Sequence, residues 1–433
     1  MPRRKVLLER EPFPRSTFII YENHWEDYLM GNYRFHTPDG VIDILPQDAS
    51  AKRKIETDIR ELFSGYGYSE VETPGIEYYD VYASGDYVST EDMFKMTDMD
   101  GRIIALRFDG TIPVARLSAT LLKDEKPPLR LSYIENMYRF PKAGGGKLRE
   151  FSQAGVELLG LQSSESDAEV IALGIQSVLT TGITDLQVSV GQVDFFKGLA
   201  EEWGLSTEDE LELSTAIDQK DIVRIEKTAE RLGLSEDAKE ILDMISNKFG
   251  TYDVLDAFDS KVNNSRSKAA LNNLREILKV LEDYELIQYV SVDLGMLRSL
   301  DYYTGMIFKG FTYEIGFPIL SGGRYDKVIS NFGRDLEAVG FSLGINLCLT
   351  ALRRQDKLSE FSEVDAIVGY AEGEGMRKAA FATAKELRAM GNKVIVDTEH
   401  RSEEALDAYA EEHGIDQVIY IEEEEDTEED ENT

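Results

Sequence analysis

Hydrophobic and polar positions recur with different periods along the chain, and each period predicts a type of element. From residue 48 to residue 66, apolar side chains recur three or four positions apart at Ile55, Ile59, Leu62 and Phe63, which predicts a helix with one buried face. A second helix is predicted at 168–180. Short apolar or alternating runs predict strands at 69–73, 94–97, 103–107, 130–138, 153–159 and 186–190. This part of the chain is therefore expected to form a β-rich body with helices packed on it.

Residues 194–286 have a different composition and a different period. They are rich in Glu, Lys, Leu, Ala and Asp, repeat at helical spacing and show hardly any strand pattern. We therefore predict a helical insertion within the β-rich body. Beyond it, a Gly-Gly turn at 321–324 is expected to lead into a helix, and a further helix runs through 347–353. Strands are expected at 290–293, 304–311, 313–317 and 338–343.

The last part of the chain predicts a small unit of its own. Strands at 366–370, 393–396 and 417–421 alternate with helices at 375–390 and 402–413, and this βαβαβ order favours a parallel sheet. The end of the chain is almost entirely acidic and cannot bury a core, so it is expected to be disordered. The predicted divisions are an N-terminal extension at 1–33, a core at 34–355, the small α/β unit at 364–421 and an acidic tail at 422–433.

Charge and residue types narrow the function. The chain has 82 Asp and Glu against 47 Lys and Arg, a formal net charge of -35, so most of its surface would repel a nucleic acid backbone. A local basic patch on a protein from a salt-rich host is the alternative that leaves RNA binding open. The lone cysteine, Cys348, and four scattered histidines offer no disulfide framework and no metal-ligand spacing. Without a run of roughly 20 apolar residues, no membrane helix is predicted, and the cytoplasm is the expected compartment.

Several motifs, taken in order, resemble those of histidyl-tRNA synthetases. Leu300-Asp301-Tyr302-Tyr303-Thr304-Gly305 resembles one histidine-specific motif of that family, and Gly322-Gly323-Arg324-Tyr325-Asp326 resembles the other. Similar segments are 39–46 at the start of the core, 106–111 where the family usually has Leu-Arg-Pro-Glu-Gly-Thr, and 149–157 at the end of motif 2. The resemblance spans roughly residues 36–350 in the right order, so chance does not explain it.

The resemblance implies a fold and a choice between two branches of the family. The implied fold is α+β: a class II aminoacyl-tRNA synthetase-like antiparallel sheet of about six or seven strands with helices, the helical insertion and a small C-terminal α/β domain. One branch is the synthetase, which activates histidine with ATP and loads tRNA. The other is the regulatory subunit of ATP phosphoribosyltransferase, which reports histidine to the first step of histidine biosynthesis. The two branches differ in which half of the site they keep.

The half of the site that would hold histidine is kept. Glu157 and Gln153 lie four residues apart on one predicted strand and therefore share a face, from which they can accept hydrogen bonds from an ammonium or an imidazole. Tyr302 and Tyr303 would offer a ring and a hydroxyl beside Gly305. Core packing and a solvated strand face are the alternatives for each residue taken singly. The histidine-binding residues that the resemblance implies are Asp80, Thr111, Gln153, Glu157, Arg298, Tyr302 and Tyr303.

The half that would activate histidine with ATP is changed. Activation needs cations on the triphosphate. Motif 3 usually reads Gly-Leu-Glu-Arg-Leu in the synthetases, and here it reads Gly344-Ile345-Asn346-Leu347-Cys348, so Leu347 replaces the arginine. Lys147 replaces an arginine of motif 2, whose planar fork a lysine cannot reproduce. A shifted alignment, with Arg353 or Arg354 in place of the lost arginine, is the alternative. The vestigial ATP site is expected at Arg107, Arg139, Lys147 and Arg324.

These features favour the regulatory branch. The resemblance implies a non-catalytic regulatory subunit of ATP phosphoribosyltransferase that binds L-histidine for feedback control and activates a short-form catalytic subunit, with no metal or cofactor. A homodimer within a hetero-octamer, with no nucleic acid and no membrane partner, is the expected assembly. One alternative is an active histidyl-tRNA synthetase with unusual ATP contacts, which Leu347 disfavours. Another is a free-standing histidine-binding paralogue with a different partner.

Overall fold

The centre of the molecule is a mixed sheet whose middle strands are antiparallel, as the resemblance predicted. A computed structural model describes residues 33–85, 90–140, 148–297, 303–358 and 364–422. The sheet has eight strands in the order β1-β5-β6-β11-β10-β9-β7-β8. Neighbours from β5 to β7 are antiparallel, and β1 and β8 pair in parallel at the two edges. In this order their bounds are Ser69–Glu70, Leu129–Tyr138, Glu150–Leu159, Ala338–Gly344, Leu320–Arg324, Met306–Thr312, Leu186–Gln192 and Val290–Val292.

The two faces of this sheet bury different kinds of residue. On β6, Ala154, Val156 and Leu158 are fully buried in the main hydrophobic core, while Gln153 and Glu157 alternate with them and lie on the opposite face. Helices α2 (Pro46–Gly65), α5 (Ser164–Thr180), α11 (Ser265–Asp283) and α12 (Ile345–Arg354) pack together on the core side. Gln153 and Glu157 therefore face away from the main core.

A smaller layer covers the face that carries Gln153 and Glu157. It contains the three-stranded sheet β2-β4-β3 and the helices α3 (Asp80–Ala83) and α4 (Thr111–Thr120). The strands β2 (Ile76–Tyr78), β4 (Ile103–Leu106) and β3 (Lys95–Thr97) are antiparallel, so the hairpin predicted over 94–107 is confirmed.

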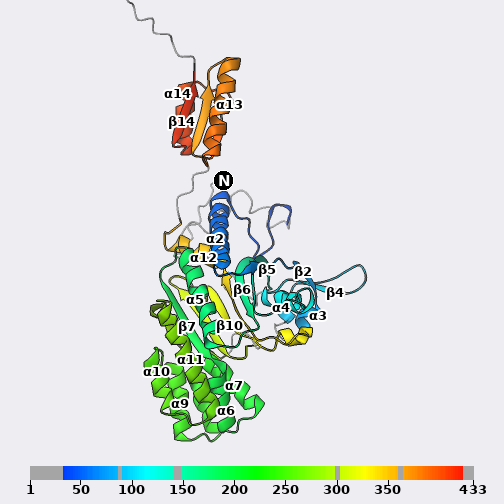
Figure 1. Cartoon of the computed structure of the whole chain (residues 1–433), viewed down its shortest axis with the longest axis vertical. Helices are drawn as coiled ribbons and strands as arrows, with labels where there is room; N and C mark the ends of the chain where they lie inside the picture. The colour runs from blue at the N-terminus through cyan, green and yellow to red at the C-terminus, as the bar shows by residue number, and fades with distance from the viewer. Residues whose placement is uncertain (1–32, 86–89, 141–147, 298–302, 359–363, 423–433) are drawn as a thin grey trace, which may run out of the picture.

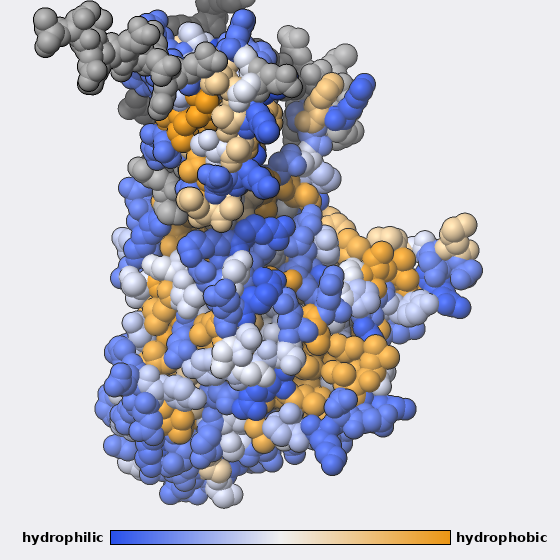
Figure 2. Space-filling view, turned by 45° about the horizontal axis from the view of Figure 1, so that its top comes forward, coloured by the Kyte–Doolittle hydropathy of each residue, from blue (hydrophilic) through white to orange (hydrophobic). Residues whose placement is uncertain are grey.

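Figure 2 shows a largely hydrophilic face of the molecule with hydrophobic residues gathered in patches. Ile76, Tyr78 and Met96 of the small sheet are among the exposed hydrophobic residues.

The predicted helical insertion is present and shares its core with the central sheet. Its helices lie at one end of the long axis in Figure 1. Buried residues of the insertion such as Phe195, Leu213 and Phe258 belong to the same hydrophobic cluster as the strands of the sheet. The helices are α6 (Val193–Glu202), α7 (Thr207–Asp218), α8 (Ile222–Arg231), α9 (Glu236–Asn247), α10 (Tyr252–Asp259) and α11. Because the two regions share one close-packed core, a displacement of the sheet strands would also displace helices of the insertion.

The C-terminal unit has the predicted βαβαβ order with a parallel sheet. The strand order is β13-β12-β14, and Figure 1 shows the unit at the other end of the long axis. Ala366 and Val368 face a cluster with α13, whereas Ile367 faces a cluster with α14, so a helix covers each side. The bounds are β12 (Ala366–Tyr370), α13 (Glu374–Ala389), β13 (Val394–Val396), α14 (Glu403–His413) and β14 (Gln417–Ile421). The domain boundaries, the N-terminal extension and the acidic tail stay predictions, since residues 1–32 and 423–433 lie outside the described part.

Three details of the central sheet differ from the prediction. The sheet has eight strands rather than six or seven because β1 and β8 add short parallel edges. No strand forms over 313–317, where Glu314 has a φ of 68° that ends the extended backbone. The predicted turn at 321–324 is instead part of β10, followed by the 3₁₀ helix η4 (Ile329–Phe332). Gly322 is needed there for close packing, because a Cβ atom at this position would lie 2.5 Å from the Gly340 carbonyl oxygen of β11.

The described residues contain neither a membrane-spanning helix nor a candidate metal site. None of the described helices combines the length and the apolar character that crossing a membrane requires. Within the same ranges, no group of three or more His, Cys, Asp or Glu side chains is arranged to hold a metal ion.

Candidate functional site

Glu157 of β6 is a buried carboxyl group held by two hydroxyl groups. Its side chain is fully buried. Thr111, the first residue of α4, donates its hydroxyl to Oε1 at 2.7 Å, and the Tyr325 hydroxyl donates to Oε2. Gly340 faces Glu157 across the β6–β11 pair, and a Cβ atom there would lie 1.9 Å from Oε2. Only glycine on β11 leaves room for this carboxyl group.

Glu157 has hydroxyl partners but no cation among the described Lys and Arg side chains. Burial raises its pKa to about 8, and the hydrogen bonds from Tyr325 and Thr111 oppose only part of that shift. The negative charge of Asp109 adds to the rise. A cation arriving beside Glu157 would therefore meet a carboxyl group that ionises readily near neutral pH.

Two further acceptor atoms in the same region are buried without a hydrogen-bond partner: Gln153 Oε1 and Asp109 Oδ2. Gln153 shares the face of β6 with Glu157. The other oxygen of Asp109 accepts a hydrogen bond from the Ile112 N–H at 3.0 Å, and burial raises the pKa of this carboxyl. Because buried polar atoms are normally paired, these acceptors suit a ligand that carries N–H groups.

Tyr303, which belongs to the first histidine-specific motif, lies close to these carboxyl groups. Its ring packs against the cluster of Val193, Met296 and Ile307, and a Cβ atom on Gly323 would lie 2.8 Å from that ring. Burial raises the pKa of the Tyr303 hydroxyl, and the charges of Glu157 and Asp109 raise it further. The side chain is therefore placed to border a ligand bound at Glu157.

The predicted histidine-binding residues fall into three groups. Thr111 and Tyr303 lie beside Glu157, and Gln153 shares its face of β6 four residues away. Asp80 is exposed at the start of α3, and none of the described contacts joins it to Glu157. Arg298 and Tyr302 lie outside the described residues.

Asp109 and Tyr325 were not predicted as site residues, although both lie in segments that resemble family motifs. Asp109 occupies the position of the glutamate in Leu-Arg-Pro-Glu-Gly-Thr, and Tyr325 follows Arg324 in the second histidine-specific motif. Their contacts with Ile112 and Glu157 depend on which segments meet in the fold, so spacing alone could not assign them.

The cations predicted for a vestigial ATP site are largely engaged with the protein itself. Arg107 forms an ion pair with Glu135 at 2.8 Å and donates to the Thr73 carbonyl oxygen at 2.6 Å. The Arg139 guanidinium lies 4.5 Å from the centre of the Phe108 ring, and its Nε donates to the Phe108 carbonyl oxygen at 3.1 Å. Lys147 lies outside the described residues. Assignment of these residues to an ATP site stays a prediction.

The last predicted cation, Arg324, is 5% exposed and makes hydrogen bonds with all of its N–H groups. Nε and Nη2 donate to Asp167 Oδ1 at 3.0 and 2.6 Å, and Nη2 also donates to Ser166 Oγ at 3.2 Å. Nη1 donates to the Leu161 carbonyl oxygen and to Asp326 Oδ1, each at 3.0 Å. Since a guanidinium has five N–H groups, none is left over for a phosphate.

The motif 3 residues serve packing and backbone contacts. Leu347 packs at the edge of the main core. Asn346 Oδ1 accepts a hydrogen bond from the Ser152 N–H at 2.7 Å, which ties α12 to β6. A separate hollow of about 360 Å³ is lined by residues of α7 and α8 and contains none of the predicted site residues.

Comparisons with known proteins agree with the geometry. Residues 40–347 match the histidyl-tRNA synthetase family. The ATP phosphoribosyltransferase regulatory subunit of Acetivibrio thermocellus is 47% identical over 393 residues, which cover 90% of this chain and 94% of that protein. The same subunit of Ruminiclostridium cellulolyticum is 44% identical over 393 residues, covering 90% and 93%.

Solved structures give the same result for the fold. A structure from Bacillus halodurans, described as an ATP phosphoribosyltransferase regulatory subunit/histidyl-tRNA synthetase, has a TM-score of 0.80 and 32% identity, covering 89% of this chain and 98% of that one. Histidyl-tRNA synthetase from Nostoc sp. has a TM-score of 0.76 at 21% identity and covers 88% of this chain and 90% of that one, which is a likeness of fold alone. The predicted α+β class II synthetase-like fold is confirmed.

Proposed function

Because the chain belongs to the family of ATP phosphoribosyltransferase regulatory subunits, we propose that it binds free histidine at Glu157 and thereby controls a catalytic ATP phosphoribosyltransferase subunit. The names of the relatives confirm a regulatory rather than a catalytic role. The partner in this proposal is a short-form catalytic subunit, in a hetero-octamer that contains homodimers of this chain.

The observation that carries the proposal is the buried Glu157 carboxyl without a described cationic partner. Histidine brings an ammonium group and an imidazole N–H, and both are donors. The ammonium group would supply the missing positive charge at Glu157, and Gln153 Oε1 and Asp109 Oδ2 would accept the remaining N–H groups. Tyr303 would border the ligand. A ligand held in this way is recognised by its donors and its charge.

Histidine can regulate a catalytic partner only if the active and inhibited assemblies bind it with different affinity. The site suits this requirement because its contacts come from separate elements: β6 supplies Glu157, α4 supplies Thr111 and the segment before β9 supplies Tyr303. A small relative movement of these elements would change several contacts at once.

The test is calorimetric titration of histidine into the full chain and into Glu157→Gln. The substitution keeps the size of the side chain and removes its charge, so we expect affinity to fall by about 2–5 kcal/mol, or roughly 30-fold to several thousand-fold. Glu150→Gln on the same strand is the matched control, because residue 150 lies on the opposite face and should leave binding within about threefold.

Mixing each variant with the catalytic subunit completes the experiment. Wild type and Glu150→Gln should make the ATP phosphoribosyltransferase reaction sensitive to histidine, and Glu157→Gln should not. Equal histidine binding by Glu157→Gln and wild type would place the ligand elsewhere. Histidine-dependent exchange of labelled pyrophosphate into ATP is expected to be absent, and clear exchange would favour the synthetase alternative.

A further inference from the structure

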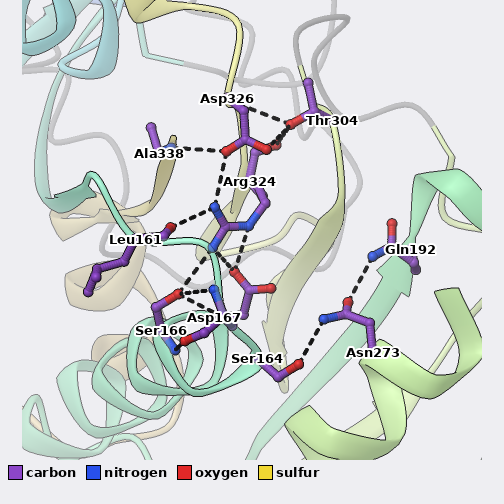
Figure 3. Close-up of polar contacts among 11 residues, drawn as sticks. Leu161, Ser164, Ser166, Asp167, Gln192, Asn273, Thr304, Arg324, Asp326 and Ala338 are labelled. Atoms are coloured by element: carbon purple, nitrogen blue, oxygen red, sulfur yellow. Dashed lines mark hydrogen bonds and ion pairs between the residues drawn. The ribbon is translucent and has the colours of Figure 1, made fainter. Parts of the chain in front are cut away.

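Arg324, the last residue of β10, lies at the centre of a buried network of hydrogen bonds (Figure 3). Its partners come from three directions: Asp167 and Ser166 in the first turn of α5, the Leu161 carbonyl oxygen before that helix, and Asp326 beyond β10. Since every N–H group of Arg324 is used, the guanidinium connects these segments.

One end of the network reaches the ligand site. The Thr304 N–H donates to the Arg324 carbonyl oxygen at 2.8 Å. The Thr304 hydroxyl lies 3.2 Å from Asp326 Oδ2 and accepts from the Asp326 N–H at 3.0 Å. Thr304 directly follows Tyr303, whose ring borders the carboxyl groups of the site. A ligand that moves Tyr303 therefore moves a residue held by the network.

The other end reaches the helical insertion (Figure 3). Asn273 of α11 donates to Ser164 Oγ, at the start of α5, at 3.1 Å. The same side chain accepts from Gln192 Nε2 at 2.8 Å, and Gln192 caps α6 by accepting from the Asp194 N–H at 3.2 Å. Asn273 thus joins the first and last helices of the insertion to the helix that holds Arg324.

A second contact runs directly between the site and α6. The Val193 N–H donates to the Gly305 carbonyl oxygen at 3.1 Å, and Val193 belongs to the apolar cluster on which Tyr303 packs. The start of α6 is therefore held both by the backbone that follows Tyr303 and by Gln192. Because both contacts hold the start of α6, a small displacement of the backbone near Tyr303 would move this helix.

We propose that Asn273 is a positioning residue that couples histidine occupancy at the Tyr303 side of the site to helices α6 and α11, so that the insertion reports histidine to the catalytic partner. This inference rests on the proposed histidine site and assigns a role to helices outside the residues proposed to hold the ligand. The helices respond because the Asn273 amide ties both of them to α5.

The experiment compares Asn273→Ala with Asn272→Ala and wild type in the reconstituted complex. Asn272 is the matched control, because it is the exposed neighbour on the same helix and is bonded only to Arg275 at 3.2 Å among the described contacts. Histidine affinity, the histidine concentration for half inhibition, and amide exchange of α6 and α11 with and without histidine are measured on the same samples.

We expect Asn273→Ala to bind histidine within about threefold of wild type while half inhibition needs at least tenfold more histidine. Histidine should slow amide exchange in α6 and α11 of wild type and of Asn272→Ala but not of Asn273→Ala. Unchanged inhibition in Asn273→Ala, or an equal loss of binding and inhibition, would overturn the coupling role. If wild type itself does not bind histidine, the proposed function fails, and calorimetry alone reveals it.

Discussion

Glu157 and Arg324 are both buried ionisable groups, but their described partners differ in charge. Arg324 is surrounded by acceptors that match each of its donors, including the carboxylates of Asp167 and Asp326. Glu157 is equally buried, but its described partners are the neutral hydroxyls of Thr111 and Tyr325. The two groups lie on the same sheet and differ mainly in whether one of the described residues brings an opposite charge.

The difference separates a structural charge from a binding site. A fully paired buried ion has nothing left to offer a ligand, and removing its partner leaves an uncompensated charge. A buried carboxyl without a cation lowers stability at a pH where it is ionised, and a cationic ligand removes that cost. We therefore assign Arg324 to the buried network that holds β10, α5 and the neighbouring segments together, here called the frame. We infer that Glu157 belongs to the proposed ligand site.

The largest expected effect tests the frame. Arg324→Met leaves the buried Asp167 and the partly exposed Asp326 without their cation. We therefore expect a loss of about 3–5 kcal/mol of stability, seen as a lower midpoint of thermal unfolding. Arg324→Lys should lie between this variant and wild type, since a lysine keeps the charge but cannot reproduce the bonds of the planar fork.

The control for this prediction is an exposed arginine in a simple ion pair. Arg60 pairs with Glu70 at 2.7 Å, and both side chains are more than 40% exposed. Arg60→Met should cost no more than about 1 kcal/mol. Equal effects of the substitutions at Arg60 and Arg324 would show that the buried network does not hold the frame.

A smaller effect is expected for the pH dependence of histidine binding. Glu157 has a pKa of about 8 without ligand, and under the proposed function its ionised form would bind the ammonium group of histidine. As pH rises from 7 to 8, the ionised fraction grows about fivefold, so affinity should rise by about the same factor. Histidine keeps its ammonium group protonated over this range, so the change comes from the protein.

Calorimetry gives this prediction a second readout. At pH 7, binding should release a proton from Glu157, so the measured enthalpy should change with the ionisation enthalpy of the buffer. Glu157→Gln should show neither the rise in affinity nor the proton release. A wild-type affinity that stays flat from pH 7 to pH 8 would contradict a cation bound at Glu157.

The sequence predicted the elements with a strong local period and the motifs, but not the partners of buried side chains. The helix at 48–66, the hairpin at 94–107 and the last βαβαβ unit follow from spacing and turn residues. Gly322 and Gly323 looked like a turn because the close approach of β11 is not visible along the chain. The pairing of Arg324 with Asp167, more than 150 positions earlier, follows from strand register and helix packing, which no local pattern encodes. Asp80 was assigned to the histidine site by resemblance, and its side chain is exposed. A matching position along the chain does not determine which side chains meet in the fold.

The smallest expected effect concerns the motif 3 region. The resemblance implies that these positions bind ATP in the synthetases, whereas here they make packing and backbone contacts. Asn346→Ala removes the acceptor for the Ser152 N–H and should lower stability by about 1 kcal/mol. Asn346→Asp keeps an acceptor oxygen and should stay within about 0.5 kcal/mol of wild type, as measured by chemical unfolding. Aspartate also returns an acidic residue to this motif, but neither variant should gain pyrophosphate exchange because Leu347 still supplies no cation. Exchange activity in Asn346→Asp would mean that the neighbouring arginines already serve the phosphates, and the distinction between frame and site would then fail for this half of the molecule.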